Sequence, residues 1–180
     1  MFQAHLNHVH CMAQTEPTMR YRFMRALLIC FFLFISCVGM AQSIMGKVVR
    51  IIDGDTYDLL TPEQTVMRIR MYGIDAPERS MPFYSKSKDY LASLCFSREV
   101  RMEMMTTDRN GRVVGKTFLP DGKEAGEQMI LAGMAWHFTR YSSDQNLHEA
   151  EQSARKEKRG LWIDADPVAP WDWRRQKRGN

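Results

Sequence analysis

The chain has 180 residues, 44% of them hydrophobic, which is enough for one ordinary buried core but hardly for two. A formal net charge of +4 at pH 7 excludes a polycation that total charge alone would draw to nucleic acid. Cys11, Cys30 and Cys37 lie in the first 41 residues, so the remaining chain keeps one cysteine and can form neither an internal disulfide nor a cysteine metal site. We therefore expect a single domain with appendages.

A secretory signal peptide is the first element that the sequence predicts. Three arginines within 20–25 precede an apolar run over 26–38, and the small residues Gly39 and Ala41 follow it. A basic start, an apolar middle and small residues before a cleavage point are typical of an export signal. The run is shorter than the roughly 20 apolar residues that a membrane-spanning helix needs. We therefore assign residues 19–41 to a signal peptide and expect an exported protein, either periplasmic or secreted.

The N-terminal region carries two further expectations. Residues 1–18 show no apolar periodicity, and we interpret them as a non-native extension, with translation starting at Met19 or Met24. The four residues that end at Cys37, Phe-Ile-Ser-Cys, loosely resemble a lipoprotein processing site. Acylation there would anchor the protein to a membrane without spanning it, so a membrane-anchored lipoprotein is the alternative to a freely exported protein.

The remaining chain alternates strand-like and helical segments. In chain order, we expect strands over 44–52, 56–60 and 66–74, a helix over 85–95, a hairpin of strands over 100–107 and 112–119, a helix over 124–131, a strand-like stretch over 135–141 and a final helix over 145–158. Ser85 would cap the first helix, and Gly133 would end the second. In the third strand Met67, Ile69 and Met71 fall on one face, which predicts that this face is buried.

Five short strands with helices inserted between and after them predict a small closed barrel of the OB type that carries α elements, mainly β with α in class. Residues 42–163 would form this domain, and 164–180 a basic tail that contains Trp171 and Trp173. These two indoles either pack back onto the barrel or stack on a nucleic-acid base. Residues 1–41 hold three arginines and one glutamate, so the whole chain's 25 basic and 21 acidic side chains fall to 22 and 20 without them. Any nucleic-acid interface must therefore come from local arrangement of charge.

Acidic and basic side chains recur at the ends of the predicted strands: the acids flank the glycine of the first turn and follow the third strand. The set consists of Asp53, Asp55, Arg70, Asp75, Glu78 and Arg112. Carboxylates gathered at one mouth of a barrel would repel one another unless a cation lay among them. Oxygen ligands without a His or Cys companion suit a hard ion, Ca²⁺ or Mg²⁺, and argue against zinc.

Each of these residues also has an ordinary structural explanation. The Asp-Gly-Asp stretch 53–55 is a typical hairpin turn, 75–78 is a reasonable turn before a helix, and Arg70 could be a solvated surface residue. A calcium loop of the EF-hand type that began at the first acid would need Gly and Glu where the chain has Asp58 and Gln64. The ligands must therefore come from separate strands, and only their combination indicates a function.

The combination extends over most of the chain. Its motifs are Asp53-Gly-Asp-Thr, Arg70-x4-Asp75-x-Pro-Glu78, Asp108-Arg-Asn-Gly-Arg112, Ala132-Gly-x-Ala-Trp136, Tyr141 and Glu151-x2-Ala-Arg followed by Arg159-Gly-Leu-Trp162. Over about residues 44–163, this order resembles the staphylococcal nuclease (thermonuclease) family. The resemblance implies a five-stranded OB-fold barrel with three helices, an α+β fold. It also implies an endonuclease, a Ca²⁺-dependent hydrolase that cleaves DNA and RNA with little sequence preference and leaves 3′-phosphate ends.

The same resemblance implies which residues bind the metal ion. Asp55 and Asp75 would be carboxylate ligands of Ca²⁺, and the backbone carbonyl of Ala76 would be another. Asp53 would be a further carboxylate of the metal site, one layer away from the ion.

Three residues would then carry the chemistry. Hydrolysis of an anionic phosphodiester needs a cation on its oxygens, an activated water and donors aimed at the charge that grows in the transition state. Glu78 would be the base or the group that orients the water. Arg70 and Arg112 would contact the scissile phosphate, because each guanidinium can give it a bidentate pair of hydrogen bonds.

Substrate contacts are expected from Arg109, Asn110 and Tyr141. The founding members of the family carry tyrosines at the positions that align with Asn110 and Thr139, so this chain departs from the pattern there. The expected partners are DNA and RNA substrates, with a monomeric enzyme and no stable protein partner. The alternative is a non-catalytic OB-fold module that binds single-stranded nucleic acid, whose signature would be the loss of some acidic or arginine positions. All six positions are present.

Overall fold

The computed structural model describes residues 43–179, which belong to a compact unit over Ala41–Asn180. The predictions for residues 1–18, for the signal peptide over 19–41 and for acylation at Cys37 lie outside the described residues. Within the part that is described, no helix combines the length and the apolar character that crossing a bilayer requires.

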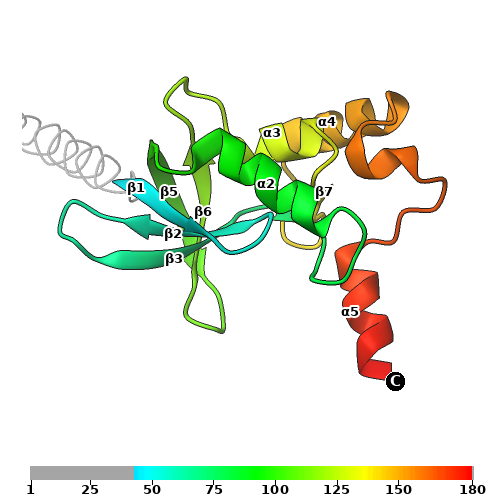
Figure 1. Cartoon of the computed structure of the whole chain (residues 1–180), viewed down its shortest axis with the longest axis horizontal. Helices are drawn as coiled ribbons and strands as arrows, with labels where there is room; N and C mark the ends of the chain where they lie inside the picture. Colours follow the sequence, from blue (N-terminus) through cyan, green and yellow to red (C-terminus); the bar gives the residue numbers. More distant parts are fainter. Residues whose placement is uncertain (1–42, 180) are drawn as a thin grey trace, which may run out of the picture. The chain divides into compact units, whose positions relative to one another are not determined.

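Five strands close into a barrel in the order β1-β2-β3-β6-β5 (Figure 1). They are β1 (Ser43–Ile51), β2 (Thr56–Leu60), β3 (Val66–Met71), β5 (Glu99–Thr107) and β6 (Val113–Phe118). Neighbours pair antiparallel except β3 and β6, which run parallel and close the barrel. The five-stranded barrel predicted from the sequence is confirmed.

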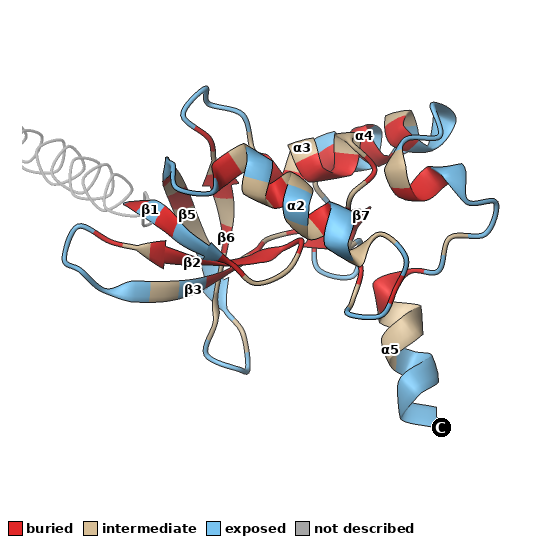
Figure 2. Ribbon diagram, viewed as in Figure 1, coloured by how far each residue is buried: buried red, intermediate tan, exposed pale blue. Residues whose placement is uncertain are grey.

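The inside of the barrel is apolar, as the alternation of residues along its strands predicts. On β3, Ile69 and Met71 are buried and Arg68 is exposed (Figure 2). The buried hydroxyl of Tyr57 lies 2.8 Å from that of Thr117 on the other side of the barrel, so neither polar group is left unpaired. The barrel is therefore a packed core, and chemistry has to take place at its rim.

The third strand is shorter than predicted. It ends at Met71, because Gly73 adopts a left-handed conformation (φ 74°) that turns the chain. The next two residues form a separate strand, β4 (Ile74–Asp75), which pairs with β7 (Trp136–His137). The strand expected over 135–141 is accordingly reduced to these two residues.

Three helices lie beside the barrel: α2 (Tyr84–Cys95), α3 (Ala125–Leu131) and α4 (Gln145–Lys156) (Figure 1). The prediction that Ser85 caps α2 is wrong. Phe83 takes that position in a left-handed conformation (φ 67°) and its carbonyl accepts the N–H of Ser87, so the helix starts one residue earlier. Gly133 ends α3 as predicted, with φ 66° and its N–H bonded to the carbonyl of Ile130.

The chain ends in a further helix, α5 (Pro170–Gly179), which follows a short 3₁₀ turn, η1 (Gly160–Ile163). The three helices expected over 44–163 are α2, α3 and α4, and α5 is an additional helix in the tail that the sequence analysis did not predict. Proline suits the first position of a helix, and the basic residues Lys177 and Arg178 in the last turn complement its negative end. Trp171 on this helix stacks on Phe138 at 5.2 Å between ring centroids, which favours packing over a free indole.

Candidate active site

The first turn is built so that only glycine fits at its centre. A Cβ placed on Gly54 would collide with the Cβ of Ala76, at 2.8 Å, and with the hydroxyl of Ser87. Ser87 cannot move aside freely, because its hydroxyl donates to the carbonyl of Met134 at 2.7 Å. The turn between β1 and β2 therefore lies directly against the segment that follows β4.

This close approach brings Asp55 onto the backbone of residue 76. Asp55 Oδ2 accepts the N–H of Ala76 at 2.8 Å, and Oδ1 accepts the hydroxyl of Thr56 at 2.9 Å. Only 6% of Asp55 is exposed. The carboxylate is thus fixed in orientation by neutral donors from two separate segments.

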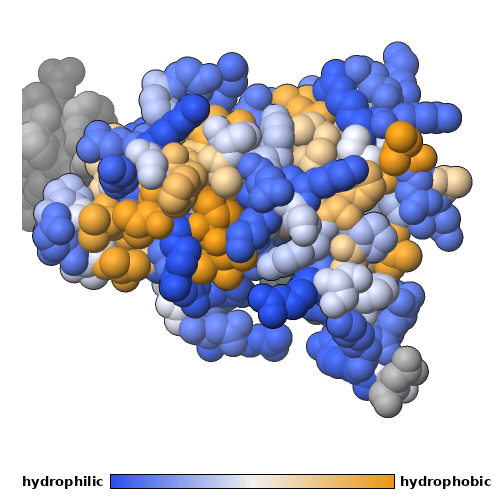
Figure 3. Space-filling model, in the orientation of Figure 1, coloured by the Kyte–Doolittle hydropathy of each residue, from blue (hydrophilic) through white to orange (hydrophobic). Residues whose placement is uncertain are grey.

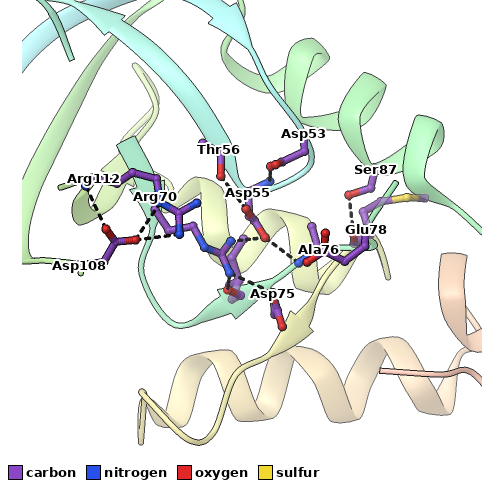
Figure 4. Close-up of polar contacts among 12 residues, drawn as sticks. Asp53, Asp55, Thr56, Arg70, Asp75, Ala76, Glu78, Ser87, Asp108 and Arg112 are labelled. Atoms are coloured by element: carbon purple, nitrogen blue, oxygen red, sulfur yellow. Dashed lines mark hydrogen bonds and ion pairs between the residues drawn. The ribbon is translucent and has the colours of Figure 1, made fainter. Parts of the chain in front are cut away.

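Asp75 comes to the same place from β4, where it is paired in register with Trp136 and buried. Arg70 on β3 joins the two acids: its Nη2 lies 2.9 Å from Asp75 Oδ1 and its Nη1 contacts Asp55 Oδ2. Nη2 also donates to the carbonyl of Ile74 at 3.1 Å. Figure 4 shows these side chains pointing toward one another at the rim of the barrel.

Asp53 lies at the edge of this cluster and shapes it through the backbone. Its Oδ1 accepts the N–H of Asp55 at 3.1 Å. Burial raises the pKa of Asp53 above its usual value, although the positive charges of Arg70 and Arg112 act in the opposite direction. A carboxylate with a raised pKa lacks full compensation for its charge, which is the situation that a bound cation relieves.

Glu78 is half-exposed and receives an arginine that the sequence did not assign to the site. Arg174, on α5, lies 2.5 Å from Glu78 Oε1 through Nη1 and 2.6 Å from Asp75 Oδ2 through Nη2. A signal for this contact exists in the sequence: Arg174 follows Trp171 by three residues, and this spacing puts both on one face of a helix. The spacing is informative only if the tail is helical, and the sequence analysis did not predict a helix there.

Arg112 lies next to the cluster but is held by a different acid. Its Nε donates to Asp108 Oδ2 at 2.8 Å, and its backbone N–H donates to Oδ1 at 3.0 Å (Figure 4). Arg109 and Asn110 are exposed at the tip of the same turn. Tyr141 is 63% exposed, and its ring lies 4.9 Å from that of Phe138.

The structure thus joins six of the predicted site residues and leaves four outside. Contacts or hydrogen bonds link Asp53, Asp55, Arg70, Asp75, Ala76 and Glu78. Among the described residues, no hydrogen bond or ion pair connects Arg109, Asn110, Arg112 or Tyr141 to these six. The roles of all ten remain predictions.

The described part of the chain, residues 43–179, contains no group of three or more His, Cys, Asp or Glu side chains that could hold a metal ion. Guanidinium groups lie between the acids instead. Three carboxylates, those of Asp55, Asp75 and Glu78, share the guanidiniums of Arg70 and Arg174. Asp53 beside them makes no ion pair among the described residues, so four acids meet two guanidiniums in direct contact. A divalent cation among the acids would add to the positive charge of the two guanidiniums.

Comparison with known proteins identifies the family to which this chain belongs. The model of the family described as "Staphylococcal nuclease homologue" matches residues 68–164. The chain is 41% identical over 138 residues to an "Uncharacterized endonuclease" of Escherichia coli, covering 77% of this chain and 90% of that protein. It is 38% identical over 143 residues to a "Micrococcal nuclease" of Shigella flexneri, covering 74% and 82%. It is also 36% identical over 166 residues to "Protein ParB" of Escherichia coli, covering 87% and 93%. This chain therefore belongs to the staphylococcal nuclease family, and it is an enzyme.

Proposed function

We propose that this enzyme is a Ca²⁺-dependent endonuclease that hydrolyses DNA and RNA with little sequence preference and leaves 3′-phosphate ends. The observation that carries the proposal is the meeting of two buried acids, Asp55 and Asp75, around Arg70 at the barrel rim. Buried carboxylates in excess of their guanidinium partners favour a bound cation, and the arginines beside them favour an anionic substrate.

The groups at the rim fit calcium. Asp55, Asp75 and the backbone carbonyl of Ala76 offer oxygen atoms only, which a hard cation prefers, and no His or Cys ligand accompanies them. When bound, Ca²⁺ would neutralise charge on the oxygens of the scissile phosphate.

The remaining chemistry comes from the side chains of the chain itself. Glu78 takes a proton from the attacking water, whose oxygen forms a bond to phosphorus while the bond from phosphorus to the 5′ oxygen breaks. The leaving 5′ oxygen takes up a proton from the solvent and ends as a hydroxyl, so the phosphate stays on the 3′ side. Arg70 and Arg112 donate to the phosphate oxygens, where negative charge grows in the transition state.

Low sequence preference follows from the kind of groups at the site. Guanidinium contacts to a phosphate carry no information about the base. Tyr141, exposed beside Phe138, offers a ring on which any base can stack, and Arg109 and Asn110 at the turn offer polar contacts. A shallow set of contacts of this kind would accept both DNA and RNA. We propose that the enzyme acts on them as a monomer.

We also propose that the enzyme is exported by the signal peptide over residues 19–41. Mass spectrometry of the protein recovered outside the cytoplasm should then find Gln42 at its N-terminus. A lipid on Cys37 would instead support the membrane-anchored alternative.

The decisive test of the catalytic proposal is a cleavage assay on single-stranded DNA, duplex DNA and RNA, with Ca²⁺ and with a chelator. Products that polynucleotide kinase can label without prior dephosphorylation carry a free 5′ hydroxyl and hence a 3′ phosphate. The variant Asp55→Asn controls for contaminating nucleases. Cleavage that persists undiminished in chelator, or products with 5′ phosphates, would contradict the proposal.

A further inference from the structure

The C-terminal helix α5 places a guanidinium directly on the carboxylates of the site. Arg174 contacts both oxygens of Asp75, at 3.2 Å from Oδ1 and 2.6 Å from Oδ2, and it contacts Glu78 Oε1 at 2.5 Å. Asp75 Oδ1 also receives Arg70. The three hydrogen bonds to Asp75 take up most of the acceptor sites of the carboxylate, so a cation that binds Asp75 competes with the arginines for it.

The two arginines differ in how firmly they are held. Arg70 belongs to the barrel, its side chain is 14% exposed, and it bonds two acids and the carbonyl of Ile74. Arg174 is 37% exposed and comes from the last helix, with no further partner than Asp75 and Glu78 among the hydrogen bonds of the described residues. Arg174 is consequently the one that a cation displaces at lower cost.

The helix keeps Arg174 close to the site by an anchor that does not involve charge. Trp171 stacks on Phe138 with 2° between the ring planes and meets Trp136 edge-on at 5.6 Å. Beyond this anchor, the visible surface of α5 is mainly hydrophilic (Figure 3). A guanidinium that leaves Asp75 thus stays beside the site, where a bound phosphate is the strongest alternative partner.

We propose that Arg174 is a further substrate-binding residue that the divalent cation releases. Without the cation, its guanidinium rests on Asp75 and Glu78. Once the cation occupies Asp75, its two positive charges repel the guanidinium, which then binds a phosphate of the nucleic acid and leaves Glu78 open to water. This inference rests on the proposed function, because it takes Asp75 as a ligand of the cation.

The first experiment measures Ca²⁺ binding to the full chain by calorimetry, without nucleic acid. Arg174→Gln should bind Ca²⁺ roughly five- to tenfold more tightly than the wild type, because the ion no longer competes with a guanidinium. Arg175→Gln removes the same charge one position along, where the side chain pairs with Asp172 instead, and should change the affinity by less than about twofold. Trp171→Ala keeps Arg174 but removes its anchor, so it should shift the affinity in the same direction as Arg174→Gln.

The second experiment measures binding of deoxythymidine 3′,5′-bisphosphate at saturating Ca²⁺. Arg174→Gln should weaken this binding about tenfold, because a charge-assisted pair to phosphate is lost, whereas Arg175→Gln should not. A tighter Ca²⁺ site with unchanged nucleotide affinity would overturn the substrate role of Arg174. Unchanged Ca²⁺ affinity in Arg174→Gln would overturn the competition.

One further variant separates this inference from the proposed function. If Asp75→Asn loses Ca²⁺ binding while Arg174→Gln binds as the wild type does, the inference alone fails. If Asp75→Asn binds Ca²⁺ as tightly as the wild type, the metal assignment of the proposed function fails, and the inference fails with it.

Discussion

Two buried aspartates three residues apart, Asp55 and Asp58, have opposite surroundings. Asp58 has two arginines to itself: Arg50 donates to its Oδ2 at 2.8 Å and Arg68 to its Oδ1 at 2.9 Å. Asp55 shares the single guanidinium of Arg70 with Asp75. Both aspartates are almost fully buried, at 6% and 3% exposure. Burial of an acid therefore does not by itself distinguish a site from a structural ion pair.

The balance of charge does distinguish them. The hydrogen bond from Arg68 holds the pKa of Asp58 below its usual value, so this carboxylate is compensated. Burial raises the pKa of Asp53 in the other cluster, where acids outnumber their partners. An acid whose charge is matched by its arginine partners stabilises the fold. A cluster with more acids than arginines keeps an affinity for a cation.

The largest effect is expected where the excess charge is removed. Asp55→Asn and Asp75→Asn should each lower cleavage on the order of 10³-fold or more, because the metal ion contributes several kcal/mol to the transition state. In Asp55→Asn, where Arg70 keeps Asp75 as a partner, the free energy of unfolding without the ion should stay the same or rise, since clustered carboxylates repel one another. Steady-state kinetics measure the loss of cleavage, and chemical denaturation measures the free energy of unfolding. Full activity at the Ca²⁺ concentration used for the wild type would end the metal assignment.

Arg112→Lys is expected to have the next largest effect, a loss of about 10²-fold in kcat. An ammonium group cannot reproduce two parallel hydrogen bonds to phosphate in the transition state. Kinetics that separate kcat from KM provide the measurement. If KM alone changed, Arg112 would bind the substrate without favouring its transition state.

Asp58→Asn should behave in the reverse manner, with lost stability and retained chemistry. Leaving Arg50 and Arg68 without their acid should lower the free energy of unfolding by about 1–2 kcal/mol, because both arginines are partly solvated. Asp121→Asn, which breaks an exposed pair with Lys123, is the matched control and should leave the free energy of unfolding unchanged within error. Urea denaturation gives both values. Loss of activity in correctly folded Asp58→Asn would contradict the claim that Asp58 serves only a structural ion pair.

The smallest effect is expected at His137, a buried imidazole whose surroundings favour its neutral form. His137 is 3% exposed, and burial lowers its pKa below the usual 6.5. The folded state then binds fewer protons than the unfolded state, so the stability from neutral His137 is present above pH 6.5 and is lost as the pH falls through its lowered pKa. Unfolding titrations from pH 7.5 to 5 should show a larger loss of stability in the wild type than in His137→Gln. Parallel curves would contradict it.

The sequence predicted the barrel well because strands such as β3 and the first part of β5 alternate apolar and polar residues. It placed the end of the third strand wrongly, since a left-handed Gly73 and a two-residue strand leave no periodicity to detect. The helix α5 was missed for a similar reason: its ten residues include only two large apolar side chains, Trp171 and Trp173.

The candidate site was predictable where its residues lie in motifs and unpredictable where they do not. Asp55 and Asp75 stand close to turns whose spacing is informative. The contact of Arg174 with Asp75 spans 99 positions, and no local pattern encodes a meeting over that distance. It depends on the path of the whole chain, through the indoles that hold α5 in place.

Those indoles give the enzyme a spectroscopic property. Trp136 pairs in register with Asp75, and its ring lies 4.3 Å from that of Trp162 and 5.6 Å from that of Trp171. Three of the four tryptophans thus form one group of neighbouring rings. Trp136 in this group lies on the strand that pairs with the strand of Asp75, and Trp171 lies on the helix of Arg174. A change in either neighbour alters the environment of the same emitters, so the unlabelled protein carries its own fluorescent reporter of the site.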